Sequence, residues 1–290
     1  MGEDAPLKTY RGNCHCAAFV FEITRPELKQ VGECNCSICH KKGYAWFFAG
    51  ADDVRVVKGD MGGLKEYAFN EGNFVHRFCP NCATPIMAYC PSMPAGRNTG
   101  INARVLQDVD VWKLETQMHD GRKLEPAYRA PVYTGPAPDG NFEGGGRTYT
   151  GSCHCGAIRL AIKTPKPLDE YEKVIECNCS ICMRLADLWI YPKEENIALE
   201  GVENVAHYKL GPEVWRKVFC KYCGVHIMSD INPVSAEQVK ELPEEVQKWR
   251  EEYKDVRPLN IRVLNDFDSN TVKTQRIDGW NLYPPLYVNP

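Results

Sequence analysis

The cysteines are the residues of this sequence whose type and spacing could do chemistry. The chain has 15 cysteines in 290 residues. The first half contains a C-x-C pair, a C-x-C-x-x-C triplet and a C-x-x-C pair, which are Cys14 and Cys16, then Cys34, Cys36 and Cys39, then Cys79 and Cys82. Such short spacings let several thiolates meet at one point, which is typical of zinc sites. A disulfide framework is disfavoured, because we expect a chain in a reducing compartment.

The same series of cysteines occurs again in the second half. Its members are Cys153 and Cys155, then Cys177, Cys179 and Cys182, then Cys220 and Cys223. Glu-Cys-Asn-Cys-Ser-Ile-Cys is identical at residues 33–39 and 176–182, and Asp-Gly recurs at 120–121 and 278–279. A repeat unit as long as a domain indicates gene duplication rather than a solenoid. Cys90 has no counterpart, and we expect it to be a small buried or surface residue.

The cysteines of each half divide into a set of four and a set of three. The two outer pairs supply the four thiolates of a closed structural zinc site, which would stabilise a small β-domain. This predicts one site from Cys14, Cys16, Cys79 and Cys82, and another from Cys153, Cys155, Cys220 and Cys223. Three protein ligands with an open fourth position are how catalytic zinc is usually held. We therefore expect two structural zinc ions and up to two reactive ones, the latter at Cys34, Cys36 and Cys39 and at Cys177, Cys179 and Cys182.

Charge narrows the chemistry expected at a three-thiolate site. Three thiolates leave zinc with a formal charge of about −1, which makes it a weaker activator of water than zinc with neutral imidazole ligands. A sulfur or carbonyl ligand, such as a small thiol or a thiol–aldehyde adduct, suits the site better. Two alternatives stay open, namely a second structural zinc completed by His40 or His226, and a triplet that binds no metal.

Strands are expected to position most of these cysteines. Residues 17–23 and 157–162 alternate as strands do, and the apolar segments around Arg104 and Arg262 follow the same pattern. Alternate side chains share one face of a strand, so a C-x-C pair would direct both sulfurs to one side. The intervening His15 and His154 would then point away from the metal, and we expect them to be packed or exposed rather than catalytic.

The fold class expected is mainly β, with two duplicated zinc-binding domains of folded-sheet, β-tent-like form. Residues 134–147 are rich in Gly and Pro, which indicates a linker between a first domain at 1–138 and a second at 147–290. Residues 235–254 differ from the rest. Ser235 at an N-cap position and Pro243 at the start of a second helical stretch predict a helical insertion in the second domain.

Composition disfavours several classes of function. The chain is 43% hydrophobic and 25% charged, as ordinary globular proteins are. A formal net charge of −3 gives no basic footprint for nucleic acid. Its first residues lack the pattern of a signal sequence, and no apolar run reaches membrane-spanning length. We expect a soluble cytoplasmic protein whose partner is a small molecule.

The cysteine motifs also resemble a known family. G-x-C-H-C at residues 12–16, C-N-C-S-I-C at 34–39 followed by basic residues, and F-C-x-x-C-G at 219–224 are similar to the glutathione-dependent formaldehyde-activating enzyme family, which includes centromere protein V. The resemblance covers both halves almost entirely. It implies a folded β-sheet domain, structural zinc at the outer four cysteines, and a second zinc at the middle three, where glutathione and its formaldehyde adduct are handled.

The resemblance implies a carbon–sulfur lyase that interconverts S-(hydroxymethyl)glutathione with glutathione and formaldehyde. On this basis Cys34, Cys36 and Cys39 are the expected catalytic group and a small thiol is the expected partner. A zinc-stabilised scaffold without catalytic activity is the competing hypothesis. Members of the family differ in chemistry, so a related small metabolite is also a candidate substrate.

The two halves depart from the family pattern at different places. The first half keeps basic residues and a glycine after its triplet, His40 to Gly43, whereas the second reads Met183 to Ala186. This favours the first half for reactivity. The second half instead keeps Gly224 after its last cysteine, where the first half has Ala83.

Several neighbouring residues have two interpretations. Small polar residues inside the triplets are expected to orient the loop or to donate hydrogen bonds to sulfur; these are Asn35, Ser37, Asn178 and Ser180. Arg104 and Arg262 are expected to form salt bridges, with a substrate carboxylate as the alternative partner. The aromatic residues that follow the triplets could line a ligand site or belong to the core; these are Tyr44, Trp46, Phe47, Trp189 and Tyr191.

Overall fold

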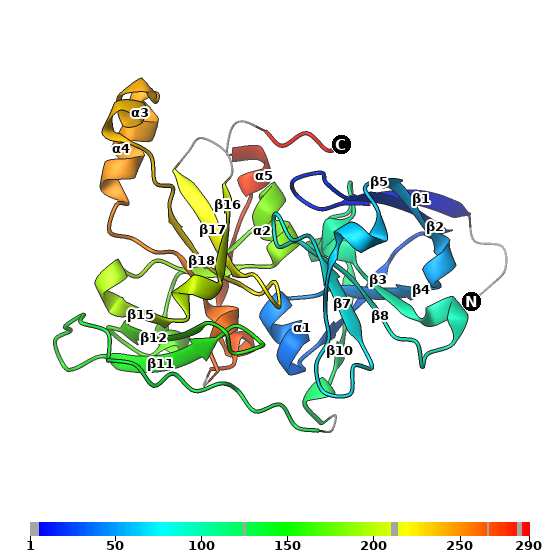
Figure 1. Ribbon diagram of the computed structural model, residues 1–290, viewed down its shortest axis with the longest axis horizontal. Coiled ribbons are helices and arrows are strands. Elements are labelled where there is room, and N and C mark those ends of the chain that lie inside the picture. The colour runs from blue at the N-terminus through cyan, green and yellow to red at the C-terminus, as the bar shows by residue number, and fades with distance from the viewer. Residues whose placement is uncertain (1–5, 124–125, 210–213, 266, 283–285) are drawn as a thin grey trace. The chain divides into compact units, whose positions relative to one another are not determined.

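Two compact units, each built mainly of strands, make up the chain (Figure 1). The computed structural model describes residues 6–123, 126–209, 214–265, 267–282 and 286–290. The first unit comprises Met1–Tyr128, Ser180–Ala186 and Tyr287–Pro290, and the second comprises Arg129–Cys179 and Asp187–Leu286. The predicted fold class, mainly β with two similar halves, is confirmed.

The first half forms a small and a large sheet. Their strand orders are β1-β2-β5 and β10-β3-β4-β9-β8-β7-β6. The strands are β1 (Leu7–Asn13), β2 (Val20–Pro26), β3 (Gln30–Cys34), β4 (Trp46–Ala49), β5 (Val54–Lys58), β6 (Lys65–Tyr67), β7 (Val75–Phe78), β8 (Pro85–Tyr89), β9 (Thr99–Asn102) and β10 (Glu115–His119).

The second half repeats this topology strand for strand. Its sheets have the orders β11-β12-β15 and β16-β17-β18-β19-β14-β13-β20, and the larger order read backwards matches that of the first half. The strands are β11 (Arg147–Ser152), β12 (Arg159–Thr164), β13 (Val174–Cys177), β14 (Leu188–Ile190), β15 (Ile197–Glu200), β16 (Val205–Lys209), β17 (Trp215–Cys220), β18 (His226–Ile231), β19 (Leu259–Asn260) and β20 (Thr274–Ile277). The duplication visible in the sequence is therefore a duplication of the fold.

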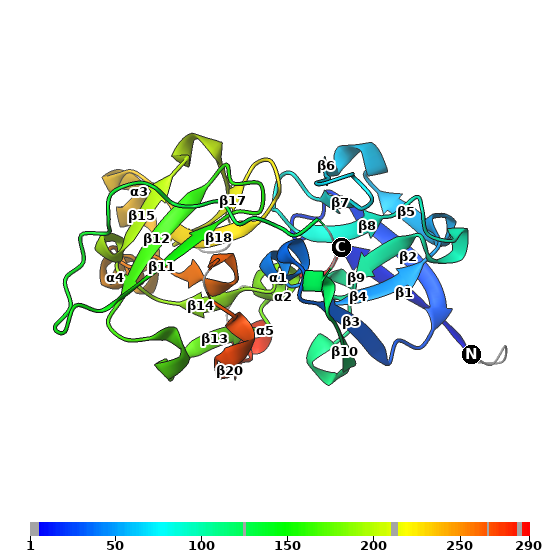
Figure 2. The ribbon, with the colours of Figure 1, turned by 90° about the horizontal axis from the view of Figure 1, so that it is seen from below.

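One parallel strand pair at the edge of each large sheet positions the triplet. β10 runs parallel to β3 and places His119 opposite Cys34, and β20 runs parallel to β13 and places Ile277 opposite Cys177 (Figure 2). Because both strands of a parallel pair end at the same edge, the residues that follow β10 and β20 lie beside the triplets. The repeated Asp-Gly dipeptides occupy these places.

Each half buries its own set of apolar side chains. Phe21, Phe78 and Ile86 are fully buried in the first half, and Leu160 and Ile162 are fully buried in the second. Strand registers shift between Arg77 and Phe78, and between Val218 and Phe219, just before each C-x-x-C. Such a bulge bends the strand, which lets the chain turn into the cysteine pair.

Helices are few and short. α1 (Ser37–Lys42) and α2 (Ser180–Leu185) follow the first two cysteines of each triplet, and α5 (Gly279–Leu282) follows β20. The predicted insertion is confirmed as α3 (Ala236–Glu241) and α4 (Glu244–Glu252), which follow β18 (Figure 1). Ser235 caps α3 by accepting a hydrogen bond from the Gln238 backbone N–H at 3.2 Å, and Pro243 precedes α4.

The Gly- and Pro-rich residues before β11 form no helix or strand within the described residues 134–146. None of the described helices has the length and apolar character needed to cross a lipid bilayer.

Candidate metal centres

The structure gathers the two outer cysteine pairs of each half into one cluster. The sulfurs of Cys14, Cys16, Cys79 and Cys82 all lie within 4.8 Å of one another, as do those of Cys153, Cys155, Cys220 and Cys223. The Cys14–Cys16 and Cys16–Cys79 sulfur distances are both 3.6 Å. A tetrahedral zinc with Zn–S bonds of about 2.3 Å needs sulfurs about 3.8 Å apart, whereas a disulfide needs about 2.05 Å. The donor set therefore fits zinc.

The C-x-C pairs lie in turns, so the prediction that strands carry them was wrong. β1 ends at Asn13, and the backbone N–H of Cys14 then donates to the Phe19 carbonyl at 3.1 Å. The Phe19 N–H donates in return to the Cys14 sulfur at 3.3 Å. A turn is required because β1 and β2 pair antiparallel across these residues. His15 lies in this turn and is largely buried, with its Nε2 3.0 Å from the Ser180 hydroxyl.

Each triplet combines the end of a strand with the first turn of a helix. Cys34 ends β3, Cys36 directly precedes α1, and Cys39 lies inside α1. Their three sulfurs lie within 4.8 Å of one another, as do those of Cys177, Cys179 and Cys182. Among the described residues, no fourth Cys, His, Asp or Glu atom joins either group. The C-x-C spacing thus works here through a strand end and a helix start.

Hydrogen bonds to sulfur hold the first triplet. The Cys36 backbone N–H donates to the Cys34 sulfur at 3.4 Å, and the Trp46 indole N–H donates to the Cys39 sulfur at 3.3 Å. Side-chain hydrogen bonds from Cys36 and Cys39 lower the pKa of Cys34, whereas hydrogen bonds with the other two cysteines and burial raise the pKa of Cys39. Without a cation, the cluster therefore favours one thiolate and opposes a third. A bound cation would relieve this repulsion.

An asparagine and an aspartate fix the loop of each triplet. Asn35, between two cysteines, donates from its side-chain amide to Asp120 Oδ1 at 3.0 Å and accepts from the Arg122 backbone N–H at 3.1 Å. Asn178 donates to Asp278 Oδ1 at 2.9 Å and accepts from the Trp280 backbone N–H at 3.0 Å. The hypothesis that these asparagines orient the loop agrees with this geometry.

Gly121, the glycine of the first Asp-Gly dipeptide, lies against the first triplet. A Cβ atom at residue 121 would lie 2.9 Å from the Cys36 Cβ atom and closer still to the Cys34 sulfur. The Gly121 backbone N–H also forms a hydrogen bond to Cys34 that lowers the pKa of that thiol. The sequence shows the Asp-Gly repeat but not this role of Gly121, because only the parallel pairing of β10 with β3 brings the residue to the triplet.

His40 and His226 are the histidines that could have supplied a fourth zinc ligand. Within the described residues, neither joins a triplet. His226 is buried at the start of β18, and its Nδ1 lies 2.5 Å from Asp187 Oδ1. Burial lowers the pKa of His226 despite the opposing effect of Asp187, so its neutral form is favoured. Lys217 Nζ lies 3.7 Å from Asp187 Oδ2 and 4.2 Å from the centre of the Trp189 ring.

The first half has a tyrosine and a histidine, Tyr44 and His76, where the second half has Asp187 and Lys217. His76 Nδ1 lies 3.3 Å from the Tyr44 hydroxyl, and Tyr44 stacks on Trp46 with ring centres 3.9 Å apart. Tyr44 and Trp46 are buried, which favours the core interpretation over an aromatic wall. The position five residues after the last cysteine of the triplet is Tyr44 in the first half and Asp187 in the second. This difference in the sequence could have indicated the buried acidic residue of the second half.

Arg104 and Arg262 lie in 3-10 turns after strands, so the expectation of strands at these residues was wrong. The turns are Ala103–Val105 and Ile261–Val263, and each begins where an asparagine side chain accepts a backbone N–H. Arg104 is buried, donates to the Gly43 carbonyl at 2.7 Å, and lies 3.5 Å from Glu33 Oε1. These contacts support the salt-bridge interpretation for Arg104.

The two positions at which one half has glycine and the other alanine both need a left-handed backbone. Gly43 and Ala186, which end α1 and α2, have φ values of 55° and 56°. Ala83 and Gly224, which follow the last cysteine of each half, have φ values of 59° and 67°. This left-handed conformation favours glycine, so each glycine satisfies the turn and says little about which half is reactive.

Three basic residues that follow the triplets, Lys41, Lys42 and Arg184, are buried. Lys42 Nζ lies 4.5 Å from the centre of the Phe78 ring. In the first unit, the Arg184 guanidinium donates to the backbone carbonyls of Asn13 at 3.1 Å and Ser180 at 2.8 Å. Arg184, the one basic residue among residues 183–186, therefore has structural partners. Cys90 is buried, as expected, with its sulfur 3.2 Å from the Ser92 hydroxyl.

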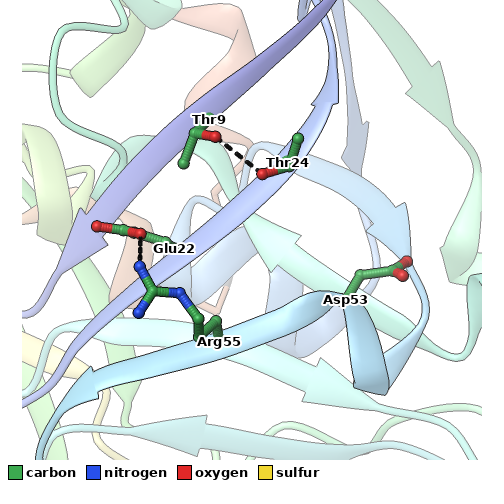
Figure 3. A pocket seen from close by; sticks show the side chains of 5 residues that line it. All are labelled: Thr9, Glu22, Thr24, Asp53 and Arg55. Carbon is green, nitrogen blue, oxygen red and sulfur yellow. Dashed lines mark hydrogen bonds and ion pairs between the residues drawn. The ribbon is translucent and has the colours of Figure 1, made fainter.

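A depression of about 360 Å³ on the small sheet of the first half contains no cysteine. Thr9, Glu22, Thr24, Asp53 and Arg55 line it, and Figure 3 shows Glu22 paired with Arg55. Glu22 also accepts from Arg11 at 2.9 Å. Of its two acidic residues, Glu22 is already paired with cations and Asp53 accepts a hydrogen bond from the Gly50 backbone N–H at 2.8 Å. Nothing in this depression therefore indicates a ligand.

Comparison with known proteins gives matches to both halves. The family model described as "Glutathione-dependent formaldehyde-activating enzyme" matches residues 9–121 and 148–254. A Halomonas elongata protein provisionally named as a glutathione-dependent formaldehyde-activating enzyme is 31% identical over 96 residues, which are 29% of this chain and 57% of that protein. A crystal structure of a Rhodobacter sphaeroides protein matches with 18% identity and a TM-score of 0.32, covering 43% of this chain and 99% of that one.

Proposed function

Because the chain belongs to the glutathione-dependent formaldehyde-activating enzyme family, we propose that it is a zinc-dependent carbon–sulfur lyase acting on a small thiol adduct of the glutathione–aldehyde type. Cys34, Cys36 and Cys39 hold the reactive zinc, and Cys177, Cys179 and Cys182 form a second candidate site. The observation that carries the proposal is the three-sulfur group that no fourth Cys, His, Asp or Glu joins among the described residues. The two four-cysteine clusters hold structural zinc.

The reaction needs a site that accepts sulfur. In the lyase direction the hydroxyl of a hydroxymethyl thioether loses its proton, its oxygen becomes the carbonyl of the aldehyde, and the carbon–sulfur bond breaks to release a thiolate. Zinc, when bound, supplies a soft electrophilic centre that stabilises a thiolate at neutral pH. Proton transfer to the thiolate then gives the free thiol.

The residues around the first triplet keep its sulfurs suitable for this task. N–H donors from Cys36, Gly121 and Trp46 reach the cluster sulfurs, and such hydrogen bonds stabilise negative charge on sulfur. The Asn35–Asp120 hydrogen bond holds the loop that carries Cys34 and Cys36. These contacts would hold the three sulfurs in one geometry around a bound zinc.

Replacing single cysteines tests the proposal. We expect Cys36→Ser to remove turnover of the hydroxymethyl adduct of glutathione with little change in the melting temperature, because Cys36 belongs to the three-sulfur site. Cys179→Ser should have a smaller effect. Cys90→Ser is the matched control, since Cys90 is buried but belongs to no cluster.

The measurements are formaldehyde release, zinc content and melting temperature of the full chain. Loss of activity in Cys179→Ser alone would move the reactive site to the second half. Absence of turnover in the unmodified, zinc-loaded protein would instead favour a zinc-stabilised scaffold. Gentle chelation separates the two kinds of site, because an open three-thiolate site should lose zinc before a closed four-thiolate site does.

A further inference from the structure

We propose that the two triplets serve different substrates, the first a thiol adduct with a net negative charge and the second a thiol adduct whose remainder is uncharged and apolar. The inference rests on the proposed function and adds a substrate class for each site. It follows from the residues that come directly after the two Asp-Gly dipeptides. These are Arg122 and Lys123 in the first half, and Trp280 and Asn281 in the second.

Arg122 and Trp280 occupy equivalent places beside the loops of the two triplets. We call the residues that follow each Asp-Gly dipeptide, together with its aspartate, the rim of that triplet. The backbone N–H groups of Arg122 and Trp280 donate to the side chains of Asn35 and Asn178, each of which lies between two cysteines of its triplet. The matching hydrogen bonds are 3.1 and 3.0 Å long. The duplicated fold therefore fixes both backbones alike and leaves the side chains to differ.

The rim of the first triplet has a net positive charge. Arg122 Nε donates to the Asn35 carbonyl at 3.3 Å, which keeps the guanidinium beside the loop of the triplet. Lys123 pairs with Asp120 at 2.9 Å, so the Asp120 charge is already offset at this rim. Arg122 and Lys123 are both exposed, so a ligand in solvent can reach them. A guanidinium at this place suits a carboxylate on the substrate.

The rim of the second triplet has no cation at the equivalent positions. Asp278 accepts from the neutral amides of Asn178 and Asn281, at 2.9 and 2.7 Å. Its carboxylate thus keeps its charge, which repels an anionic substrate. Trp280, whose backbone N–H donates to Asn178, is 37% exposed. A large, partly exposed aromatic side chain at such a place suits an apolar or aromatic substrate group.

The two triplets share the arrangement of their sulfurs and loops, and the other differences between the halves that are described above, at Lys42, Tyr44, Arg184 and Asp187, are buried. The exposed residues after the Asp-Gly dipeptides are therefore the ones that a substrate in solvent can reach. In both, three sulfurs lie within 4.8 Å of one another, and the cysteines come from the end of a strand and the start of a helix. In both, an asparagine between two of the cysteines donates a hydrogen bond to an aspartate. The bond that breaks is the same carbon–sulfur bond in both, with the hydroxyl proton removed and a thiolate released. Only the part of the substrate remote from this bond differs.

Single-site versions of the full chain allow each triplet to be measured alone. Cys179→Ser leaves the first triplet intact, and Cys36→Ser leaves the second. Each is tested with glutathione and with benzyl mercaptan by equilibrium binding, and with the hydroxymethyl adducts of both thiols by formaldehyde release. We expect the first triplet to favour glutathione, and the second to favour benzyl mercaptan, by about tenfold each.

Exchanging the rim residues should then reverse the preference. Arg122→Trp in the Cys179→Ser protein should weaken glutathione binding about tenfold, and Trp280→Arg in the Cys36→Ser protein should strengthen it by a similar factor. Arg97→Trp and Trp249→Arg are matched controls, because Arg97 is exposed and Trp249 is 39% exposed, similar to Trp280, but neither adjoins a triplet loop. Zinc content and melting temperature verify that each variant is folded.

The outcomes separate this inference from the proposed function. Equal preference at both triplets, or no change on exchange of the rim residues, overturns the inference even if the protein is an active lyase. Opposite binding preferences without any formaldehyde release support the inference and overturn the lyase reaction. A folded triplet that binds neither thiol overturns both.

Discussion

Replacing Gly121 by alanine should disrupt the first triplet without unfolding the first half. The new Cβ atom would lie 2.9 Å from the Cys36 Cβ atom, whereas carbon atoms in ordinary contact lie about 3.5 Å apart or more. One of them must therefore move by at least about 0.6 Å. Metal–ligand distances tolerate errors of only about 0.2 Å. The change exceeds this tolerance about threefold, so we expect the triplet to lose its zinc.

The stability cost of Gly121→Ala should stay moderate. Overpacking a tight site costs about 1–3 kcal/mol, which lowers the melting temperature of a domain of this size by about 3–10 °C. Zinc content should fall by the equivalent of one triplet, and turnover of the thiol adduct by about 10- to 100-fold. Metal analysis, thermal melting and formaldehyde release on the same preparation measure all three.

Gly96→Ala is the control for this prediction. A Cβ atom at residue 96 meets no other atom within 4 Å, so metal content and activity should not change. If Gly121→Ala kept its zinc, its activity and its melting temperature, the close approach of this backbone to Cys34 and Cys36 would have no part in the site. Our explanation of the glycine at position 121 would then be wrong.

Other substitutions test the structural clusters and the turns. Cys79→Ser and Cys220→Ser should each unfold their own half, because apparent zinc binding contributes on the order of 10 kcal/mol to folding of such sites; unchanged zinc content and melting would contradict the four-cysteine assignment. Asp187→Ala should destabilise the second half by about 3–5 kcal/mol in chemical denaturation, because it leaves the buried Lys217 without its carboxylate, and a loss below 1 kcal/mol would argue against that ion pair. Ala83→Gly should raise stability by about 0.5–1 kcal/mol through relief of a left-handed backbone, whereas a loss would show that the alanine is not strained.

The sequence by itself determined the duplication and the grouping of the cysteines. Zinc-type spacings are local, because a C-x-C or C-x-x-C pair is brought together by a few backbone dihedral angles. The helical insertion was equally local, since Ser235 and Pro243 act on the residues next to them. For such features no long-range contact has to be known.

Local patterns were less reliable where tertiary contacts set the backbone. Cys14 and Cys16 follow an alternating pattern, but the pairing of β1 with β2 turns the chain at these residues. Arg104 follows an apolar strand, but the Asn102 side chain caps a 3-10 turn there. The glycine differences between the halves suggested reactivity, although the left-handed φ of residues 43 and 83 shows a turn requirement.

Only the tertiary structure decided what surrounds each triplet. Gly121 is more than 80 residues from Cys34 in sequence, and the parallel pairing of β10 with β3 is what brings it to the sulfur. The partners of Asp187, namely His226 and Lys217, come from neighbouring antiparallel strands in the same way. Ligand spacing is written in short segments of the chain, whereas the environment of a metal site depends on strand pairing over long sequence separations, which residue patterns alone do not specify.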